Sequence, residues 1–419
     1  MIHAAPPARI TRDQLLDMDR NDPLAAFRDA FVLPAGIVYL DGNSLGALPR
    51  SAPERLETVI RREWGETLVR AWNQHDWIGM PLRVGSKIAR LVGARPQEVV
   101  VADSTSVNLF KLLAAALRLR PGRRFVVAAD GDFPSDLYVA QGLIELLGGG
   151  RALRRVAPDA LAAALDDDVA VLSLSHVNYK TGVMHDMAAL TRAAHAHGVL
   201  VCWDLSHSAG CMPLDLDGCD ADFAVGCGYK FLNGGPGAPA FLFVAERLQE
   251  EARQPLTGWL GHAAPFEFEP HYRPAPGIAR HLCGTPPILG LAALDAALDV
   301  LLAADLILVR AKSARLGDLF LQLVAQECAG HDLQVACPQE SERRGSQVCL
   351  RHPGGYAIVQ ALITQGVIGD FRTPDVLRFG MAPLYLRYVD LWDAIRILRE
   401  IMERGTWKSA EFQRRGAVT

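Results

Sequence analysis

The sequence predicts an α/β fold with a large, mainly parallel sheet, followed by a small α+β C-terminal domain. Between residues 95 and 300, short apolar runs bounded by turn residues alternate with segments of helical length, which is the pattern of βαβ units. The runs are apolar almost throughout, as in strands that helices cover on both faces of the sheet. The expected parts are an N-terminal segment over 1–40 that packs with the small domain, the large domain over 41–304, and the small domain over 305–419.

The composition is that of a globular enzyme. The chain has 419 residues, of which 50% are apolar and 21% charged, and this length suggests two or three domains. The 43 basic and 47 acidic residues nearly balance, which favours neither nucleic acid nor an anionic membrane as a partner. No apolar run approaches the ~20 residues that cross a bilayer. The amino terminus lacks the apolar core of a signal peptide, so we expect a cytoplasmic protein.

The eight cysteines predict neither a disulfide framework nor a zinc site. None forms a C-x-x-C pair, and none has the histidine spacing of zinc ligands. In a reducing compartment, such cysteines are small apolar core residues. Asp204 and His207 stand three residues apart and resemble a metal-binding pair. The sequence offers no further ligands at suitable spacing, and we expect no metal.

The first 80 residues lead into the large domain. Thr11 is expected to cap the first helix, and an apolar run over 37–40 precedes a compact polar loop over 41–46, which by itself is typical of an ordinary turn. A helix is expected from Ser51 through Trp64. Aromatic side chains then cluster, which indicates a packed core, an interface, or the wall of a pocket for a flat aromatic substrate; they are Trp72, His75 and Trp77.

Six strands are expected in the large domain, with helices between them. Helices over Ser106–Leu119 and Met187–His197 are long enough to connect parallel strands. The expected strands, each a short apolar run, are Val99–Val101, Arg124–Ala128, Val169–Leu174, Val199–Trp203, Phe223–Val225 and Ala240–Val244.

The small domain is expected to contain a strand, a helix, a hairpin and a closing helix. The strand covers Gln347–Arg351 and the helix covers Tyr356–Gln365. The hairpin spans Val367–Met381 and turns at residues 373–375. Apolar residues between 391 and 402 recur at helical spacing, which predicts an amphipathic last helix.

The stretch over 198–233 brings four reactive side chains to one edge of the predicted sheet. One apolar strand stops at Asp204, with His207 three residues later, and a second strand is followed by Tyr229 and Lys230. Because open α/β sheets bind ligands at the carboxyl ends of their strands, we expect these side chains around one crevice. Each alone has an ordinary explanation, such as a surface lysine or a capping aspartate. Their combination favours a functional site.

This set of residues suits pyridoxal phosphate. A lysine in a partly dry pocket can lose its proton and attack a carbonyl as a neutral amine. With the aldehyde of pyridoxal phosphate, Lys230 would form a Schiff base, and the pyridine nitrogen would need a carboxylate partner. We expect Asp204 to be that partner.

Other polar residues follow neighbouring strands. The segment over 103–106 lies between a strand end and a helix start, where it forms an ordinary cap or a phosphate site. The chain has no Walker loop and no G-x-G-x-x-G motif, which favours a small phosphorylated cofactor over a nucleotide. Phe133 could stack on a cofactor ring with Asp136 near its nitrogen, or both could belong to a proline turn. Arg378 lies in an apolar strand and needs a partner, either a substrate carboxylate or a structural salt bridge.

Eight sequence blocks resemble those of the kynureninases, a family of fold-type-I pyridoxal-phosphate enzymes. The resemblance runs from about residue 40 to 390 and so covers most of the chain. The blocks are DGNSLG (41–46), TSVNL (105–109), FPSD (133–136), WDLSH (203–207), GYKFLNGGPG (228–237), GWLGH (258–262), GTPPI (284–288) and LRFGMAPLY (377–385).

The resemblance implies a homodimeric hydrolase with shared active sites that cleaves L-kynurenine to anthranilate and L-alanine. It implies catalytic roles for Lys230, Asp204 and Tyr229, with Tyr229 as the acid that reprotonates Cβ. The further cofactor-binding residues that it implies are Thr105, Ser106, Phe133, Asp136, Ser175 and His207, and, from the neighbouring subunit, Trp259 and Thr285.

For the substrate, the resemblance implies that Arg378 holds the α-carboxylate, with Asn43 and Gly284 nearby. The glycine at 284 favours kynurenine over its 3-hydroxy form. The side chain that lines the aryl pocket is left open among Trp64, Trp72, His75 and Trp77.

Three other functions can be weighed against this one. A cysteine desulfurase or an aminotransferase shares the fold, but a desulfurase needs a nucleophilic thiol near the substrate arginine, and 379–383 contains no cysteine. A cofactor-free binding module would have no need of Lys230 together with Asp204. A nucleotide-binding dehydrogenase would carry the glycine fingerprint that is missing here.

Overall fold

The computed structural model describes residues 9–416, which form two compact units. The larger unit comprises Ser44–Tyr179 and Met184–Leu306, and the smaller unit comprises the chain up to Asn43, the stretch Lys180–Val183 and the chain from Ile307 onward. The sequence did not predict that Lys180–Val183 would group with the smaller unit. Part of the segment for which we expect no signal peptide, residues 1–8, lies outside the described residues. The last three residues of the polar C-terminal tail, 417–419, lie outside them as well.

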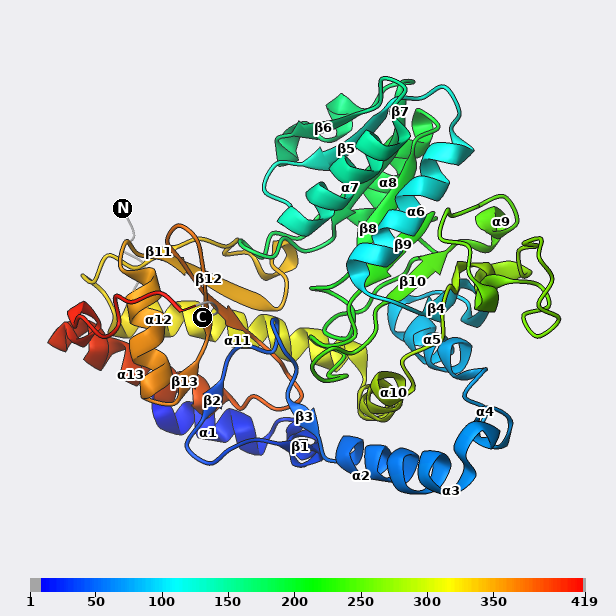
Figure 1. Ribbon diagram of the computed structural model, residues 1–419. Helices are drawn as coiled ribbons and strands as arrows, with labels where there is room; N and C mark the ends of the chain where they lie inside the picture. The colour runs from blue at the N-terminus through cyan, green and yellow to red at the C-terminus, as the bar shows by residue number, and fades with distance from the viewer. Residues whose placement is uncertain (1–8, 417–419) are drawn as a thin grey trace. The chain divides into compact units, whose positions relative to one another are not determined.

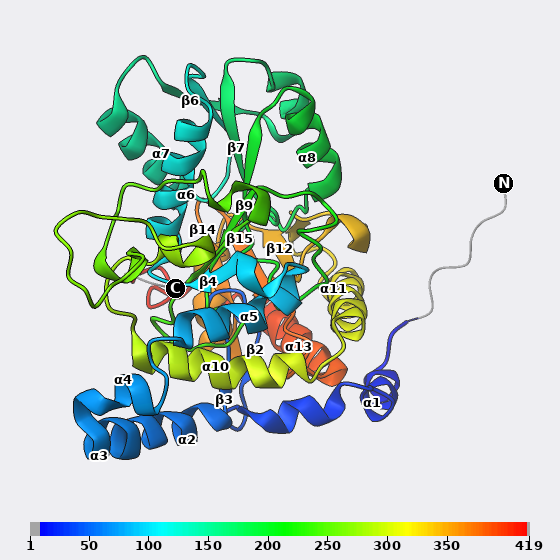
Figure 2. The same cartoon turned by 90° about the vertical axis from the view of Figure 1, so that its right-hand side faces the viewer.

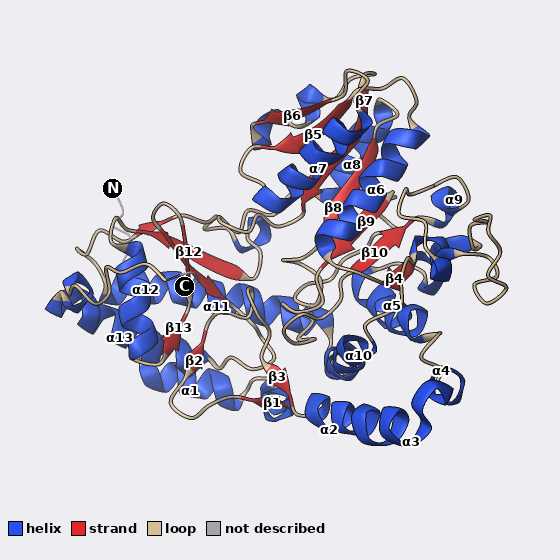
Figure 3. Ribbon diagram, in the orientation of Figure 1, coloured by secondary structure: helices blue, strands red, loops and turns tan. Residues whose placement is uncertain are grey.

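A seven-stranded sheet forms the centre of the larger unit (Figures 1 and 3). Its strand order is β4-β10-β9-β8-β7-β5-β6. Strands β5 to β9 run parallel to one another, whereas β10 runs antiparallel to both β4 and β9. This confirms the α/β class and the mainly parallel sheet. The strands are β4 (Val99–Val101), β5 (Phe125–Ala129), β6 (Ala152–Val156), β7 (Val169–Ser175), β8 (Leu200–Asp204), β9 (Phe223–Gly226) and β10 (Phe241–Val244).

Helices cover both faces of this sheet, as apolar strands require. In Figure 2, α6 (Thr105–Leu119) and α7 (Pro134–Leu147) lie on one face, and α8 (Met187–Ala196) lies on the other. Strands β7 and β8 are buried along their whole length, and the leucines of α6 pack against the sheet in the main core cluster. The remaining α-helices of this unit are α2 (Ser51–Thr58), α3 (Gly65–Thr67), α4 (Ala71–Gln74), α5 (Met80–Val92), α9 (Glu246–Gln249) and α10 (Ile288–Leu302).

Two elements of the larger unit differ from the sequence prediction. Strand β6 was not predicted, because Ala152–Val156 carries two arginines and lacks the apolar run of a central strand; it lies at the sheet edge, where partial exposure allows such residues. The helix expected from Ser51 through Trp64 is α-helical only to Thr58 and continues as a π-helix over Val59–Trp64. The six predicted strands are confirmed, with ends that shift by one residue at most.

The smaller unit has a four-stranded antiparallel sheet in the order β11-β12-β15-β14. The strand, the helix and the hairpin that turns at residues 373–375 are confirmed, as is the last helix. The strands are β11 (Gln334–Val335), β12 (Gln347–Arg351), β14 (Asp370–Arg372) and β15 (Val376–Gly380), and the helices are α1 (Arg12–Arg20), α11 (Leu306–Glu327), α12 (Gly355–Thr364) and α13 (Tyr388–Arg404).

The N-terminal segment pairs with the C-terminal part of the chain. Strand β2 (Val38–Tyr39) lies parallel to β13 (Val367–Ile368). The predicted cap on α1 is present as a capping box, in which the Thr11 side chain accepts from the Gln14 backbone and the Gln14 side chain accepts from the Thr11 backbone. Within residues 9–416, no helix combines the length and the apolar character that a bilayer span requires.

Candidate active site

A pocket at the carboxyl edge of the large sheet contains nine of the eleven predicted cofactor-binding residues. Loops that follow β4, β5, β7, β8 and β9 line it, and because β10 runs antiparallel, its N-terminal end reaches the same edge. The lining residues are Ser104, Thr105, Ser106, Phe133, Ser135, Asp136, Ser175, Tyr179, Asp204, Ser206, His207, Tyr229, Lys230, Ala238 and Ala240. The sequence therefore predicted the place of the site, and the roles of the individual residues stay predictions.

Lys230 lies in this pocket on the loop after β9. Its Nζ is 3.0 Å from Nε2 of the buried His207 and 5.9 Å from the centre of each of the Phe133 and Tyr229 rings. The loop needs a glycine at position 228, because a Cβ there would lie 2.4 Å from the Pro239 carbonyl oxygen. The sharp turn thus directs a partly buried amine toward His207 and two aromatic rings.

Asp204 ends β8 with its carboxyl group held in one orientation. Its Oδ1 accepts hydrogen bonds from the backbone N–H of Ser206 at 2.9 Å and from the Ser206 hydroxyl at 2.6 Å. The Ser206 hydroxyl also accepts from the backbone N–H of Cys227 at 3.3 Å, which links the ends of β8 and β9. A carboxylate fixed in this way can accept a hydrogen bond from a ring N–H with little further ordering.

Two more carboxyl groups lie near Asp204. Asp136, in the first turn of α7, has its pKa raised by burial and by the charges of Asp204 and Asp132. Burial, together with the charge of Asp204, raises the pKa of Asp132 to about 7, although hydrogen bonds from Ser175 oppose the shift. Sequence reasoning did not assign Asp132 to the site. The only available signal was its position just before the FPSD block.

The N-terminus of α6 offers a site for an anion. Ser104 caps the helix by accepting from the Val107 N–H at 3.4 Å, and the Ser106 and Ser135 hydroxyls are 2.9 Å apart. Thr105 adds a third hydroxyl to the pocket wall. Backbone N–H groups and hydroxyls at the positive end of a long helix favour a phosphate group.

Tyr229 shares the pocket with a phenol that stays protonated. Burial is the main reason that its pKa is raised above the ordinary value, and the charges of Cys227 and Asp204 raise it further. Phe133 is 41% exposed and packs edge-on against Tyr179, with 5.1 Å between ring centres. One face of the pocket is therefore aromatic, as stacking on a flat ring requires.

Five predicted site residues lie elsewhere. Trp259, Gly284 and Thr285 belong to the larger unit but are exposed outside the pocket. Arg378 and Asn43 belong to the smaller unit. Arg378 is 1% exposed and pairs with Asp370, which it contacts through Nε at 2.8 Å and through a second guanidinium nitrogen.

The aromatic cluster after α2 does not line the pocket either. Trp77 is buried and donates from Nε1 to Glu63 at 2.8 Å, and its ring packs edge-on against Trp72 at 5.7 Å. Trp64 is exposed. Trp77 is therefore a core residue of the larger unit, as one of the explanations for the aromatic cluster predicted. Which residue lines an aryl pocket stays an open question.

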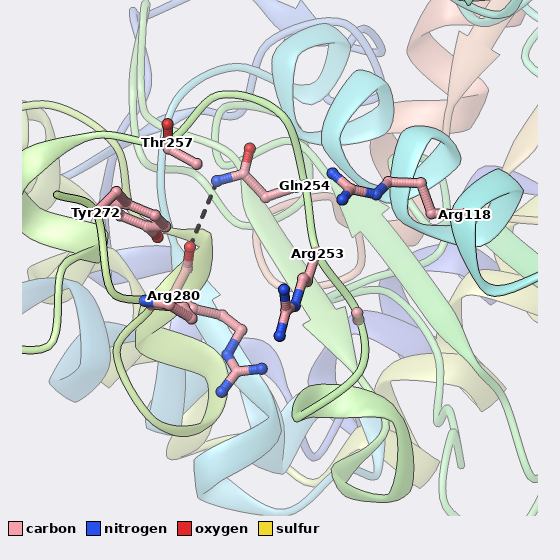
Figure 4. A pocket seen from close by; sticks show the side chains of 8 residues that line it. Arg118, Arg253, Gln254, Thr257, Tyr272 and Arg280 are labelled. Atoms are coloured by element: carbon pink, nitrogen blue, oxygen red, sulfur yellow. Dashed lines mark hydrogen bonds between the residues drawn. The ribbon is translucent and has the colours of Figure 1, made fainter.

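A second cavity in the larger unit, shown in Figure 4, contains no predicted site residue. Its buried Arg280 is already bound, because it donates to the backbone of Ala275 at 3.0 Å and to the Glu250 carboxylate at 2.7 Å. Gln254, which is labelled beside it, donates to the Arg280 carbonyl oxygen at 3.4 Å. These bonds hold the loop together and explain why a charged side chain is buried there.

Comparisons with known proteins agree with the chemistry of the first pocket. Residues 309–398 match the family model described as the kynureninase C-terminal domain. The chain is 51% identical over 414 residues to kynureninases from Pseudomonas fluorescens and from Burkholderia mallei (strain SAVP1), and these alignments cover 98% of this chain and 100% of each relative.

Solved structures show the same fold at low identity. The apo structure of a cysteine desulfurase from Thermococcus onnurineus NA1 aligns with a TM-score of 0.74 at 17% identity, over 96% of this chain and 100% of that one. A mutant of C-DES with glycine covalently linked to its PLP cofactor aligns with a TM-score of 0.76 at 19% identity, over 93% and 99%. At such identities the likeness concerns the fold alone, whereas the match to full-length relatives at 51% identity shows that this chain belongs to the kynureninase family.

Proposed function

We propose that this protein hydrolyses L-kynurenine to anthranilate and L-alanine with pyridoxal phosphate as cofactor, in the pocket that contains Lys230 and Asp204. Family membership supports the reaction. The observation that supports this pocket most strongly is that an amine and an oriented carboxylate line it together with an aromatic ring and a helix N-terminus. A phosphorylated aromatic aldehyde with a basic ring nitrogen requires this combination.

The residues of the pocket fit the cofactor. Lys230 would hold the aldehyde carbon, and Asp204 would accept the hydrogen bond of the protonated ring nitrogen. The exposed face of Phe133 would stack on the ring, and Thr105 and Ser106 at the start of α6 would hold the phosphate. When bound, the cofactor supplies an electron sink for a negative charge at Cα.

Lys230 and Tyr229 would move the protons of the reaction. As a free amine, Lys230 would take the proton from Cα of the substrate, and the His207 ring nitrogen 3.0 Å away would keep the amine in place between transfers. Tyr229 would return a proton to Cβ after the Cβ–Cγ bond breaks. Its raised pKa supports this role, because the phenol is then protonated over the whole physiological range.

The homodimer with shared sites is also part of the proposal. Trp259 and Thr285 lie outside the pocket of their own chain with exposed side chains, so a cofactor-binding role for them requires a second copy. At Gly284, an added Cβ would meet nothing within 4 Å of the same chain. If Gly284 makes the enzyme prefer kynurenine over its 3-hydroxy form, this preference would therefore also depend on the partner subunit.

The test is the pair of variants Lys230→Ala and Lys408→Ala, because Lys408 is an exposed lysine far from the pocket in the sequence. We expect Lys230→Ala to lose the visible absorption of the covalently held cofactor and to lower anthranilate formation by at least about 1000-fold, since nucleophile and base are both removed. Lys408→Ala should behave like the wild type. Full turnover in Lys230→Ala would contradict the assignment of the pocket.

A further inference from the structure

Asp132 has no role in the function proposed above, although it is buried beside the pocket. We propose that Asp132 holds a proton behind the cofactor-binding wall and that its charge state tunes how tightly the cofactor's ring nitrogen, which Asp204 would face, holds its own proton. The inference rests on the proposed function, since it concerns the same cofactor. Asp132 acts through Asp204 and is therefore a tuning residue, not a catalytic one.

The position of Asp132 connects it to Asp204 through one serine. Asp132 follows β5, where its backbone N–H donates to Ala129 at 3.3 Å, and its side chain is 4% exposed. The Ser175 hydroxyl and backbone N–H both hydrogen-bond to its carboxyl group. Ser175 ends β7 and is paired in register with Asp204 at the end of β8. The path from Asp132 to Asp204 thus crosses adjacent strands of one sheet.

The surroundings of Asp132 favour a neutral carboxyl group. Its Oδ1 is buried and has no hydrogen-bond partner among residues 9–416, and an ionised oxygen in that state would be costly. The charged group that acts on Asp132 is another carboxylate, Asp204. The charge of the Lys230 amine acts on Asp136 and lowers its pKa in part.

Three carboxyl groups in such surroundings cannot all be ionised. Burial and the charges of Asp204 and Asp132 raise the pKa of Asp136 well above its ordinary value, so its carboxyl group is the one that keeps a proton. Within the described part of the chain, there is no group of three or more Asp, Glu, His or Cys side chains that could hold a metal ion. Burial and the Asp204 charge bring the pKa of Asp132 to about 7, so this third carboxyl group is the one that gains or loses its proton near neutral pH.

The direction of the effect follows from the charges. Below neutral pH, Asp132 is neutral and Asp204 alone faces the cofactor. As the pH rises through about 7, Asp132 becomes negative, and the added negative charge raises the proton affinity of its neighbours. The ring nitrogen then holds its proton more tightly, so the electron sink strengthens on the alkaline side.

The first experiment is a pH titration of the cofactor's visible absorption in the loaded protein, with Asp132→Asn and Asp130→Asn as the variants. Asp130 lies two residues earlier with an exposed side chain that pairs with Arg155 at 3.7 Å. We expect the wild type and Asp130→Asn to show a spectral step near neutral pH and Asp132→Asn to lack it. A step that persists unchanged in Asp132→Asn would overturn the inference.

The second experiment uses the cofactor-free protein, in which infrared difference spectra between pH 5 and 9 report protonated carboxyl groups. The wild type should lose one protonated-carboxyl band as the pH rises through neutrality, and Asp132→Asn should lack that band. If Asp132→Asn does not fold, Ser175→Ala replaces it. Removal of a hydroxyl that stabilises the ionised form should then move the band's midpoint to higher pH, and an unmoved midpoint would contradict the inference.

These readouts separate the inference from the proposed function. A protein that makes no anthranilate but shows the Asp132 band would contradict the function and leave the proton on Asp132 in place. A protein that makes anthranilate while its infrared spectrum lacks the band would contradict the inference alone.

Discussion

Tyr229 shows how burial selects the chemistry of a side chain. Its phenol lines the pocket beside Lys230, and burial together with nearby negative charge raises its pKa. The neutral form is present below a raised pKa, so the acid form persists well above the pH at which a free tyrosine would ionise. At this pocket Tyr229 can therefore donate a proton at any physiological pH.

We expect Tyr229→Phe to lower kcat by about 100- to 10,000-fold, the range for loss of a general acid. The change in KM should be small, because the ring and its packing remain. Steady-state kinetics with L-kynurenine, compared with Tyr179→Phe, another tyrosine that lines the pocket, measures both constants. Equal effects of the two variants on kcat would contradict the role of Tyr229 as the acid.

The buried position of Arg378 has two explanations, a structural ion pair and a contact with the substrate carboxylate. Its guanidinium is buried with Asp370, as expected for a structural salt bridge, and the substrate-carboxylate role implied by the family resemblance stays a prediction. Removing one partner of a buried ion pair leaves an uncompensated charge, which costs about 3–5 kcal/mol.

Arg378→Met should therefore lower the free energy of unfolding of the cofactor-free protein by up to about 3–5 kcal/mol, measured by urea denaturation, since Arg372 still contacts Asp370 at 2.6 Å. Replacing both partners, in Arg378→Met with Asp370→Leu, should restore much of that stability, because no buried charge is then left unpaired and the partly exposed Arg372 can be hydrated. If the double variant is stable but its KM for L-kynurenine is unchanged, the substrate role of Arg378 is wrong.

At the scale of elements, the loop between β9 and β10 determines where the amine lies. Gly228 approaches the Pro239 carbonyl oxygen so closely that a Cβ would be 2.4 Å from it. A methyl group there has to push apart the two chain segments that form the wall of the pocket around Lys230.

Gly228→Ala should destabilise the protein by roughly 1–3 kcal/mol and weaken cofactor binding. Gly142 on α7 provides the control, because an added Cβ meets nothing within 4 Å there. Gly142→Ala should be neutral or stabilising by about 0.5–1 kcal/mol, since alanine favours a helix interior. Thermal unfolding and titration with pyridoxal phosphate test both expectations; a Gly228→Ala protein of full stability and affinity would contradict the close contact.

Sequence patterns predicted the elements that depend on local apolar periodicity. The apolar runs of β7 and β8 are buried on both faces, so their strand character and their polar ends were readable. Strand β6 was missed because an edge strand needs no apolar run. The structural salt bridge that the sequence offered for Arg378 is present, but its partner Asp370 was not named, because only the register of the hairpin identifies it.

The sequence likewise predicted one part of the candidate site and not another. Side chains that follow parallel strands must meet at one edge, so the positions of Asp204 and Lys230 followed from the pattern. The carboxyl cluster was not predictable, because its effect on proton affinity depends on burial and on distances between loops. The proposed role of Trp259 requires a second chain, and no pattern within one chain tests that requirement.

At the scale of the whole molecule, the surface of the larger unit supports the proposed homodimer. Phe268 is 77% exposed and Phe266 is 59% exposed, and both lie on the loop that carries Trp259. Exposed aromatic side chains gathered on one loop are typical of a protein–protein interface. In a dimer, this loop would reach the partner's pocket.

We expect the wild type to sediment as a dimer at micromolar concentration. Phe268→Ser should raise the dimer dissociation constant by about 10-fold or more, as the loss of one aromatic anchor at an interface does. Tyr138→Ser on α7 removes an equally exposed aromatic ring elsewhere and should have no effect. Analytical ultracentrifugation over a dilution series measures the dimer dissociation constant of each protein. A monomeric wild type would contradict the shared-site arrangement.

The most direct test of the account is to add L-kynurenine to the purified protein loaded with pyridoxal phosphate and to follow anthranilate fluorescence together with alanine release. We expect equal amounts of both products and a yellow protein whose colour depends on Lys230. A yellow protein that forms neither product would contradict the proposed reaction while retaining the cofactor site. A protein that stays colourless with the cofactor supplied would contradict the assignment of Lys230 and with it the whole site.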